Sequence, residues 1–218
     1  AFFAAVGLTP EQVVIRVNNR RLMDSELSEL GVSKEQRPLV TRLIDRRDKM
    51  KAEDWDRYAL DLGLSDEQLN GVKKILSDSE LWRKSNELTR SFAVLESLGL
   101  RDYVRFDAGI IRGLDYYTGI VFEAFDATEP GRAILGGGHY DNLVGDVGGD
   151  PLPGVGFAMG DLVISLVLQK FGLLPEYKGT NAAVLVTVFD DQRLIKSNQV
   201  ASQLRKAGVN TIVYPEVA

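Results

Sequence analysis

The chain has 218 residues, with 26 Lys or Arg against 31 Asp or Glu, so its formal net charge is −5 at pH 7. This length can bury a core and hold one or two domains, whereas the acidic balance excludes a general attraction for nucleic acid. The absence of cysteine excludes disulfides and thiolate metal sites, and no apolar run is long enough to span a bilayer, so a cytoplasmic, non-membrane protein is expected.

The first eight residues have the composition of an apolar helix already in progress, and no Met precedes them. We therefore expect a fragment that begins inside a domain. Residues 13–17 are mostly β-branched and predict a strand, which leads into the polar run Asn18-Asn19-Arg20-Arg21.

Helical patterns dominate residues 23–82 and predict a small helical insertion beside a sheet. Asp24 and Ser33 are the expected N-caps of two helices, and Ser65 begins a third. The mixed charge run at residues 46–51 fits a solvated helix end better than an RNA contact, because mixed signs weaken attraction for phosphate. Trp55 and Trp82 are assigned to the core.

Residues 83–174 predict one helix that ends at Gly99, then an antiparallel sheet. Its expected strands are residues 106–110, 120–125 and 133–137, with a hairpin loop at 126–131. An apolar helix at residues 162–171, which ends at Gly172, completes this part.

The last part begins after a linker at residues 175–181. A strand at 183–188, an amphipathic helix at 190–206 ended by Gly208 and a strand at 210–214 predict the opening of an α/β domain over 182–218. The fold class is thus α+β, an antiparallel sheet flanked by helices, with a helical insertion and the start of a C-terminal α/β domain.

The most informative segment is Arg112-Gly113-Leu114-Asp115-Tyr116-Tyr117-Thr118-Gly119, followed by Gly136-Gly137-Gly138-His139-Tyr140-Asp141-Asn142-Leu143. Arg112 can hold a carboxylate or phosphate with two hydrogen bonds, although a salt bridge to Asp115 or Asp107 is the commoner use of an arginine.

Tyr116 and Tyr117 are expected to alternate across a strand, so that their rings lie on opposite sides and one of them contacts a ligand. The three consecutive glycines forfeit side-chain packing. They fit close approach of a ligand and a structural bulge about equally well.

These motifs, together with Pro153-Gly154-Val155-Gly156-Phe157-Ala158-Met159-Gly160, closely resemble the catalytic domain of histidyl-tRNA synthetase, a class II aminoacyl-tRNA synthetase. The resemblance extends from about Val13 to the C-terminus. It implies catalytic-core portions at 1–22 and 83–174, the helical insertion at 23–82 and a truncated anticodon-binding domain at 182–218.

The resemblance also implies a site. Arg112 would be the catalytic residue and would contact the α-phosphate of ATP and the histidine carboxylate. Tyr117 would hydrogen-bond the imidazole, with Tyr116, Gly137 and Tyr140 in the same histidine pocket. Gly154 and Gly156 would let ATP approach the backbone. No protein-built metal site is implied, whereas ATP and Mg²⁺ are the expected cofactors of the parent enzyme.

Two positions depart from the family pattern. His139 stands where most relatives carry arginine, which replaces a permanent charge by a group that is mostly neutral at pH 7. As the only histidine it cannot build a typical zinc site, and a structural or surface role is expected. Asp161, Leu162 and Val163 stand where the family places the arginine that holds the γ-phosphate of ATP.

The resemblance implies L-histidine, ATP and tRNA(His) as partners and a homodimeric full-length enzyme. The two earlier class II motifs are not found, so we expect the 218-residue chain alone to lack catalytic competence. The alternative is a catalytically inactive, histidine-sensing paralogue that regulates ATP phosphoribosyltransferase. His139 and the missing arginine favour that alternative, whereas the intact 112–117 motif and the start of an anticodon-binding domain oppose it. A plain structural sheet without a ligand site is the third hypothesis.

Overall fold

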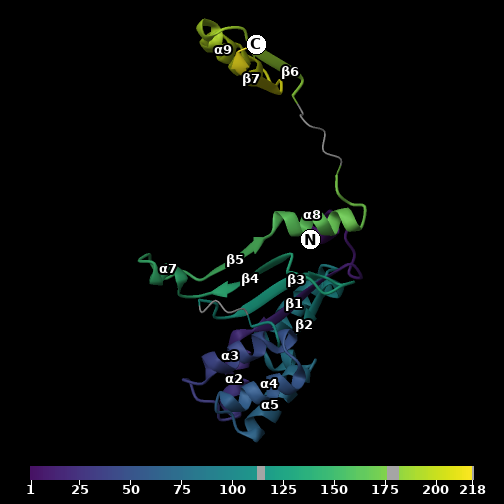
Figure 1. Ribbon diagram of the computed structural model, residues 1–218, viewed down its shortest axis with the longest axis vertical. Coiled ribbons are helices and arrows are strands. Elements are labelled where there is room, and N and C mark those ends of the chain that lie inside the picture. The colour runs from purple at the N-terminus through teal and green to yellow at the C-terminus, as the bar shows by residue number, and fades with distance from the viewer. Residues whose placement is uncertain (112–115, 176–181, 218) are drawn as a thin grey trace. The chain divides into compact units, whose positions relative to one another are not determined.

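A computed structural model describes residues 1–111, 116–175 and 182–217 of the chain (Figure 1). The chain divides into two units, Ala1–Leu174 and Pro175–Ala218, which are described separately. In the described part of the chain, no helix combines the length and the apolar composition that crossing a membrane requires.

A five-stranded sheet forms the centre of the first unit, in the order β2-β1-β3-β4-β5. Its strands are β1 (Val13–Asn19), β2 (Val104–Phe106), β3 (Ile120–Asp126), β4 (Leu135–Tyr140) and β5 (Gly154–Met159). β1 pairs with β2 in parallel, and every other pairing in this sheet is antiparallel. The predicted α+β class with an antiparallel sheet flanked by helices is therefore confirmed.

Two predicted strands were misplaced. Residues 107–110 do not continue β2, because the Asp107 carboxylate accepts a hydrogen bond from the Gly109 N–H and the Ile110 N–H bonds back to the Asp107 carbonyl. An aspartate that bonds backbone two residues on favours a turn over a strand. The strand predicted at 133–137 runs instead through Leu135–Tyr140, so the three glycines lie inside it.

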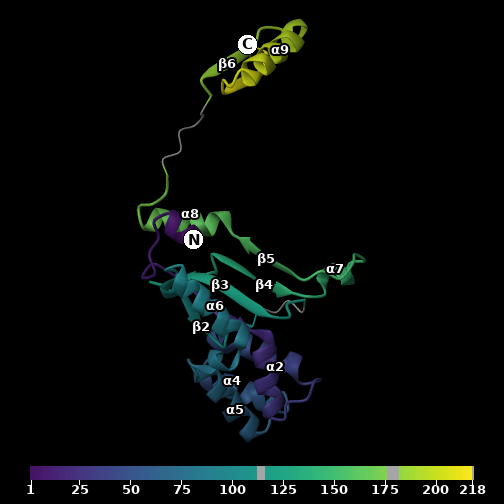
Figure 2. The same ribbon diagram turned by 180° about the vertical axis from the view of Figure 1, so that it is seen from behind.

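Helices fill the sequence between β1 and β2, and Figures 1 and 2 show α2 to α5 gathered on the β1–β2 side of the sheet. They are α2 (Arg20–Glu29), α3 (Arg37–Asp45), α4 (Ala52–Asp61), α5 (Asp66–Ser77) and α6 (Asn86–Ser97), with single turns η1 (Arg47–Lys49), η2 (Leu81–Lys84) and η3 (Arg101–Tyr103). Short α1 (Phe2–Ala5) and α7 (Leu143–Asp146) and the longer α8 (Asp161–Lys170) complete the unit.

The helix starts show which local signals decide the structure. Ser65 is the N-cap of α5, which confirms the predicted helix start, and it forms a capping box with Gln68. The prediction of Asp24 as an N-cap is wrong, because Asn19 already caps α2 by accepting hydrogen bonds from the Arg21 and Leu22 N–H groups. Ser33 and Gln36 bond reciprocally across a turn, and α3 begins only at Arg37.

The two largest of three apolar clusters among the described residues of this unit join helices to the sheet. The larger joins the helices of residues 20–97 to Val17 and Val104 of the sheet and includes the fully enclosed Trp55, with Trp82 packed against it. The smaller packs α1 and α8 against Val13 and Ala124. Both tryptophans therefore belong to the core, as predicted.

The second unit contains β6 (Val184–Val188), the single turn η4 (Asp191–Arg193), α9 (Leu194–Lys206) and β7 (Thr211–Val217). The two strands are parallel, which confirms the predicted β-α-β arrangement. Gly208 follows α9 with φ +81°, and Gly99 and Gly172 follow α6 and α8 with φ +66° and +68°. These left-handed positions explain why each of these helices ends at a glycine.

Candidate functional site

Strand alternation separates the two faces of the sheet. Register pairs Val121 with Gly138, Gly138 with Gly156, and Tyr140 with Gly154, so these residues project from one face, which we call the tyrosine face. Phe122, Gly137 and Phe157 are also paired in register and project from the opposite face, which we call the helix face.

Three tyrosines gather on the tyrosine face. The ring centroids of Tyr116 and Tyr117 are 4.5 Å apart, and the Tyr140 ring meets Tyr116 edge-on at 6.0 Å. Tyr117 is only 6% exposed and packs in an apolar cluster with Ile110 and Val121. The structure thus brings together the three tyrosines that the sequence motifs singled out.

The prediction that the rings of Tyr116 and Tyr117 lie on opposite sides is wrong. Both residues precede β3 and lie outside any strand, so strand alternation does not apply to them. Their rings are in contact with each other, which leaves two phenols on the same face.

The triple glycine of β4 is not a bulge. Residues 135–138 pair with β3, and residues 135–140 with β5, each in one unbroken register. A Cβ on Gly138 would lie 2.7 Å from the Tyr117 ring, and a Cβ on Gly137 would lie 2.6 Å from the Cβ of Phe157. Close approach of the Tyr117 ring therefore requires Gly138 on one face, and close approach of the Gly156 carbonyl oxygen and of Phe157 requires Gly137 on the other.

Gly154 and Gly156 lie under the ring of Tyr140. A Cβ on Gly154 would be 2.6 Å from Cε2 of that ring, and one on Gly156 would be 3.2 Å from the phenol oxygen. The space over the two glycines proposed for ATP is thus filled by a tyrosine proposed for histidine. A nucleotide that contacts their backbone has to displace the Tyr140 ring.

A polar network borders the tyrosines, centred on the carboxylate of Asp141. Its Oδ2 accepts from the hydroxyl of Thr118 at 2.8 Å and pairs with Nη2 of Arg21 at 2.6 Å. The other nitrogen of that guanidinium, Nη1, pairs with Glu87 of α6. The sequence motifs contain Thr118 and Asp141, but no local pattern links them to Arg21, 120 residues away from Asp141.

The groups of this network lower the pKa of Asp141. The Thr118 hydrogen bond lowers the pKa of Asp141, burial opposes this effect, and the guanidinium of Arg21 and the nearby His139 lower it further. His139, the residue that departs from the family pattern, lies with its Nε2 3.5 Å from Oδ1 of Asp141, and its side chain is 28% exposed. By strand alternation the His139 side chain leaves β4 on the same side as Gly137, so it contacts Asp141 from the helix face and not from among the tyrosine rings.

Residues 112–115, including the proposed catalytic Arg112, lie outside the described residues. Of the salt-bridge partners considered for Arg112, Asp107 pairs with Nη1 of Arg16 at 3.2 Å, and Asp115 also lies outside the described residues. Among the residues described, no three His, Cys, Asp or Glu side chains are grouped so that they could hold a metal ion.

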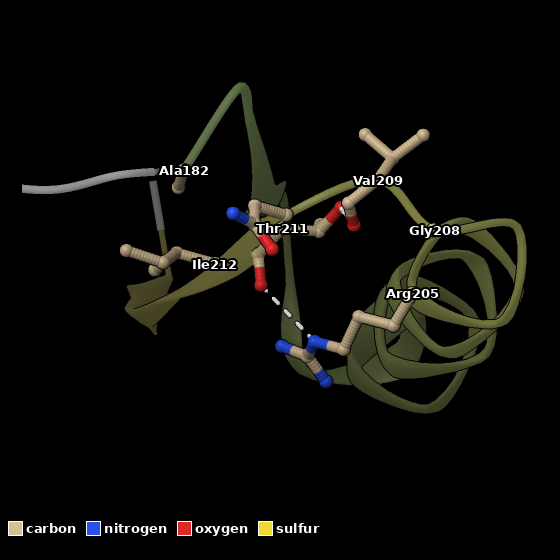
Figure 3. A pocket seen from close by; sticks show the side chains of 7 residues that line it. Ala182, Arg205, Gly208, Val209, Thr211 and Ile212 are labelled. Carbon is tan, nitrogen blue, oxygen red and sulfur yellow. Dashed lines mark hydrogen bonds between the residues drawn. The ribbon is translucent and has the colours of Figure 1, made fainter.

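A pocket of about 460 Å³ lies in the second unit, at the start of β7 and the end of α9 (Figure 3). Nε of Arg205 donates to the Thr211 carbonyl across it at 3.0 Å. The pocket faces the C-terminal end of a helix and the amino ends of parallel strands, whereas α/β ligand sites lie at the carboxyl ends. Its position thus gives little support for an anion site.

Comparisons with known proteins identify relatives of the whole chain. The family model of histidyl-tRNA synthetase matches residues 1–161. A histidine–tRNA ligase of Thermococcus kodakarensis is 35% identical over 95% of this chain. The chloroplastic/mitochondrial histidine–tRNA ligase of Arabidopsis thaliana is 33% identical, again over 95% of this chain. These alignments cover 51% and 44% of the two relatives, so the chain spans about half the length of the curated relatives it matches.

Solved structures give the same picture. The histidyl-tRNA synthetase from Nostoc sp. PCC 7120 has a TM-score of 0.70 at 27% identity, over 99% of this chain and 55% of that structure. A Bacillus halodurans protein described as an ATP phosphoribosyltransferase regulatory subunit/histidyl-tRNA synthetase has a TM-score of 0.62 over 97% of this chain and 56% of that structure. Its identity of 20% supports a common fold alone.

Proposed function

The chain belongs to the histidyl-tRNA synthetase family, and from this premise we propose that its gene product joins histidine to tRNA(His) at the expense of ATP. The observation that carries the proposal is the gathering of Tyr116, Tyr117 and Tyr140 over a glycine-rich strand pair in a chain of this family. The partners are L-histidine, ATP and tRNA(His), and a homodimer and a cytoplasmic location remain predictions.

In the proposed first step, a carboxylate oxygen of histidine attacks the α-phosphorus of ATP. The bond from that phosphorus to the bridging oxygen breaks, and pyrophosphate leaves with the electron pair. Negative charge grows on the α-phosphate oxygens, and a fixed guanidinium stabilises it without reorganisation. Arg112 is proposed for this role on sequence resemblance. In the second step a ribose hydroxyl of the tRNA attacks the acyl carbon, and AMP leaves.

The phenol of Tyr117 is proposed to hydrogen-bond the imidazole of the substrate, with Tyr116 and Tyr140 lining the pocket. Gly137, which the sequence also predicted for this pocket, lies on the helix face of β4, away from the tyrosines. Tyr117 lies in an apolar cluster with Ile110 and Val121, so an amino acid that lacks ring nitrogens would forfeit the hydrogen bond that histidine makes there. This difference in hydrogen bonding would favour histidine over other amino acids.

Mg²⁺ enters the proposal as part of the MgATP substrate. The described residues contain no group of three His, Cys, Asp or Glu side chains that could hold an ion, and Mg²⁺ in such reactions is bound largely through substrate phosphates, water and one or two carboxylates. Gly154 and Gly156 are proposed to contact the nucleotide, which requires the Tyr140 ring to move off them.

The function is tested by histidine-dependent exchange of pyrophosphate into ATP, measured on the complete gene product with each standard amino acid. We expect exchange with histidine alone, and a loss of about 100-fold or more, roughly 3 kcal/mol, in Arg112→Ala. Arg57→Ala, which removes an arginine from the exposed face of α4, is the matched control. Exchange in Arg112→Ala within a few-fold of the unmodified protein would contradict the role of Arg112.

The second candidate is a histidine-sensing regulator of ATP phosphoribosyltransferase. It is favoured by His139 and by the residues Asp161, Leu162 and Val163, which stand where the family pattern has an arginine. Histidine binding without any exchange, together with copurification of a phosphoribosyltransferase, would select this candidate over the synthetase.

A further inference from the structure

The backbone on either side of residues 112–115 is held by one short segment, residues 18–21, where β1 passes into α2. On the near side of residues 112–115, the side chain of Asn18 donates to the Ala108 carbonyl at 3.0 Å, and Nη1 of Arg20 donates to the Ile111 carbonyl at 3.3 Å. On the far side, the backbone N–H of Arg20 donates to the Gly119 carbonyl at 2.9 Å. One residue, Arg20, therefore contacts backbone on both sides of that stretch.

Through Asp141, Arg21 links the same segment to Thr118, the residue next to Tyr117. Its guanidinium pairs with Asp141, whose carboxylate accepts from the Thr118 hydroxyl. The Asp141 N–H donates back to the same hydroxyl oxygen at 3.0 Å, and the Thr118 N–H donates to the His139 carbonyl at 2.9 Å. The Thr118 hydroxyl thus donates and accepts at once, which fixes its rotamer and the backbone beside Tyr117.

Residues 18–21 are themselves held in place by buried hydrogen bonds. Asn18 and Asn19 are each 1% exposed. The amide of Asn19 donates to Ser85 at 3.2 Å and to Glu87, while its oxygen accepts from the Arg21 N–H at 2.9 Å. Buried amides with their hydrogen bonds satisfied are costly to move, because any shift leaves a polar group unpaired.

The ion pair between Arg21 and Asp141 contributes little as a source of stability. Their side chains are 50% and 35% exposed, and ion pairs of this exposure contribute little to stability because solvent screens them. The effect of this pair on the position of Tyr117 is larger than its effect on stability, because a misplaced binding group lowers the affinity for a ligand even when the fold is intact.

We propose that residues 18–21, with Thr118 and Asp141, are positioning residues that hold the Tyr117 phenol in place for the histidine substrate. They act through the backbone of residues 117–119 and through the Thr118 hydroxyl, without touching the ligand. The inference rests on the proposed function, and it adds a specific cause for the affinity of the site for histidine.

The test measures KM for histidine, KM for ATP and kcat in the exchange reaction of the complete gene product. Thr118→Val has nearly the same shape but lacks the hydroxyl, and we expect it to raise KM for histidine about tenfold and KM for ATP less than about twofold. Thr118→Ser restores the hydroxyl and should bring KM for histidine back to within about threefold. Asp141→Asn keeps an acceptor but loses the charge opposite Arg21, so its effect should be intermediate.

The matched control is Asp56→Asn, which breaks the exposed ion pair between Lys73 and Asp56 at 2.7 Å in the helical region. It should leave all three kinetic constants unchanged. A merely structural role of Thr118 predicts a lower kcat and lower thermal stability in Thr118→Val with an unchanged KM for histidine, and that result overturns the inference. If the unmodified protein shows no histidine-dependent exchange, the proposed function itself fails and the inference fails with it.

Discussion

The carboxylate of Asp141 illustrates how single residues tune this site. Three groups from separate parts of the chain face it, namely the Thr118 hydroxyl, the Arg21 guanidinium and the His139 ring. The first of these contributes most to lowering its pKa, and burial acts in the opposite direction. The ionised form is therefore the one that the folded protein favours.

This shift predicts a pH dependence of stability. Because the folded pKa of Asp141 lies below the unfolded value of about 3.9, its contribution is fully present above that value. The contribution is lost as the pH falls through the folded pKa. Urea unfolding should therefore show Asp141→Asn less stable than the unmodified chain from pH 5 to 7, with the difference shrinking below about pH 4.

The matched control is Asp61→Asn, at the exposed end of α4, which removes one carboxylate outside the network. It should not reproduce the loss of the stability difference in acid. A stability difference between Asp141→Asn and the unmodified chain that stays constant down to pH 3 would contradict the shift.

Among the elements, β4 shows how consecutive glycines in a strand make room for the side chains of its neighbours. Gly138 opens space for the Tyr117 ring on one face, and Gly137 opens space for Phe122 and Phe157 on the other. The strand keeps regular pairing with both neighbours, so the loss of its own side chains is offset by aromatic contacts across it.

Gly138→Ala tests this account. The new methyl group would lie 2.7 Å from the Tyr117 ring and 3.0 Å from the Ile120 carbonyl, so either the ring or the strand must shift. We expect a loss of about 1–3 kcal/mol in the free energy of unfolding, measured by urea denaturation. Gly131→Ala, where nothing lies within 4 Å, should change it by less than about 0.5 kcal/mol. Equal effects of the two substitutions would refute the packing explanation.

Local signals explain which elements could be predicted from the sequence. The start of α5 at Ser65 and the glycines that end α6, α8 and α9 depend on neighbouring residues alone, and these predictions are confirmed. Asn19 was missed as a cap because it also ends a strand, and its buried bonds to Ser85 and Glu87 join residues more than 60 positions apart.

In the candidate site, too, some features could be predicted from the sequence and others could not. Its tyrosines and glycines were found because they lie within two short motifs of the sequence. Their mutual arrangement was not, since Tyr116 and Tyr117 lie outside the strands from which their orientation was predicted. The link from Arg21 to Asp141 spans 120 residues, and only the folded sheet brings the two together.

At the scale of the whole molecule, every residue of the tyrosine face belongs to the unit Ala1–Leu174. The family model covers residues 1–161 and so includes this face. The described residues proposed to recognise histidine therefore all lie in this unit.

The central claim is that the Tyr117 phenol binds histidine, and calorimetric titration of histidine into the complete gene product tests it most directly. Tyr117→Phe should weaken binding about tenfold, the effect of one lost hydrogen bond in an enclosed site. Tyr103→Phe is the matched control, because it removes a phenol that donates to the Leu8 carbonyl at 2.7 Å, and it should leave the Kd for histidine unchanged. A Tyr117→Phe protein that binds histidine as tightly as the unmodified one would contradict the account.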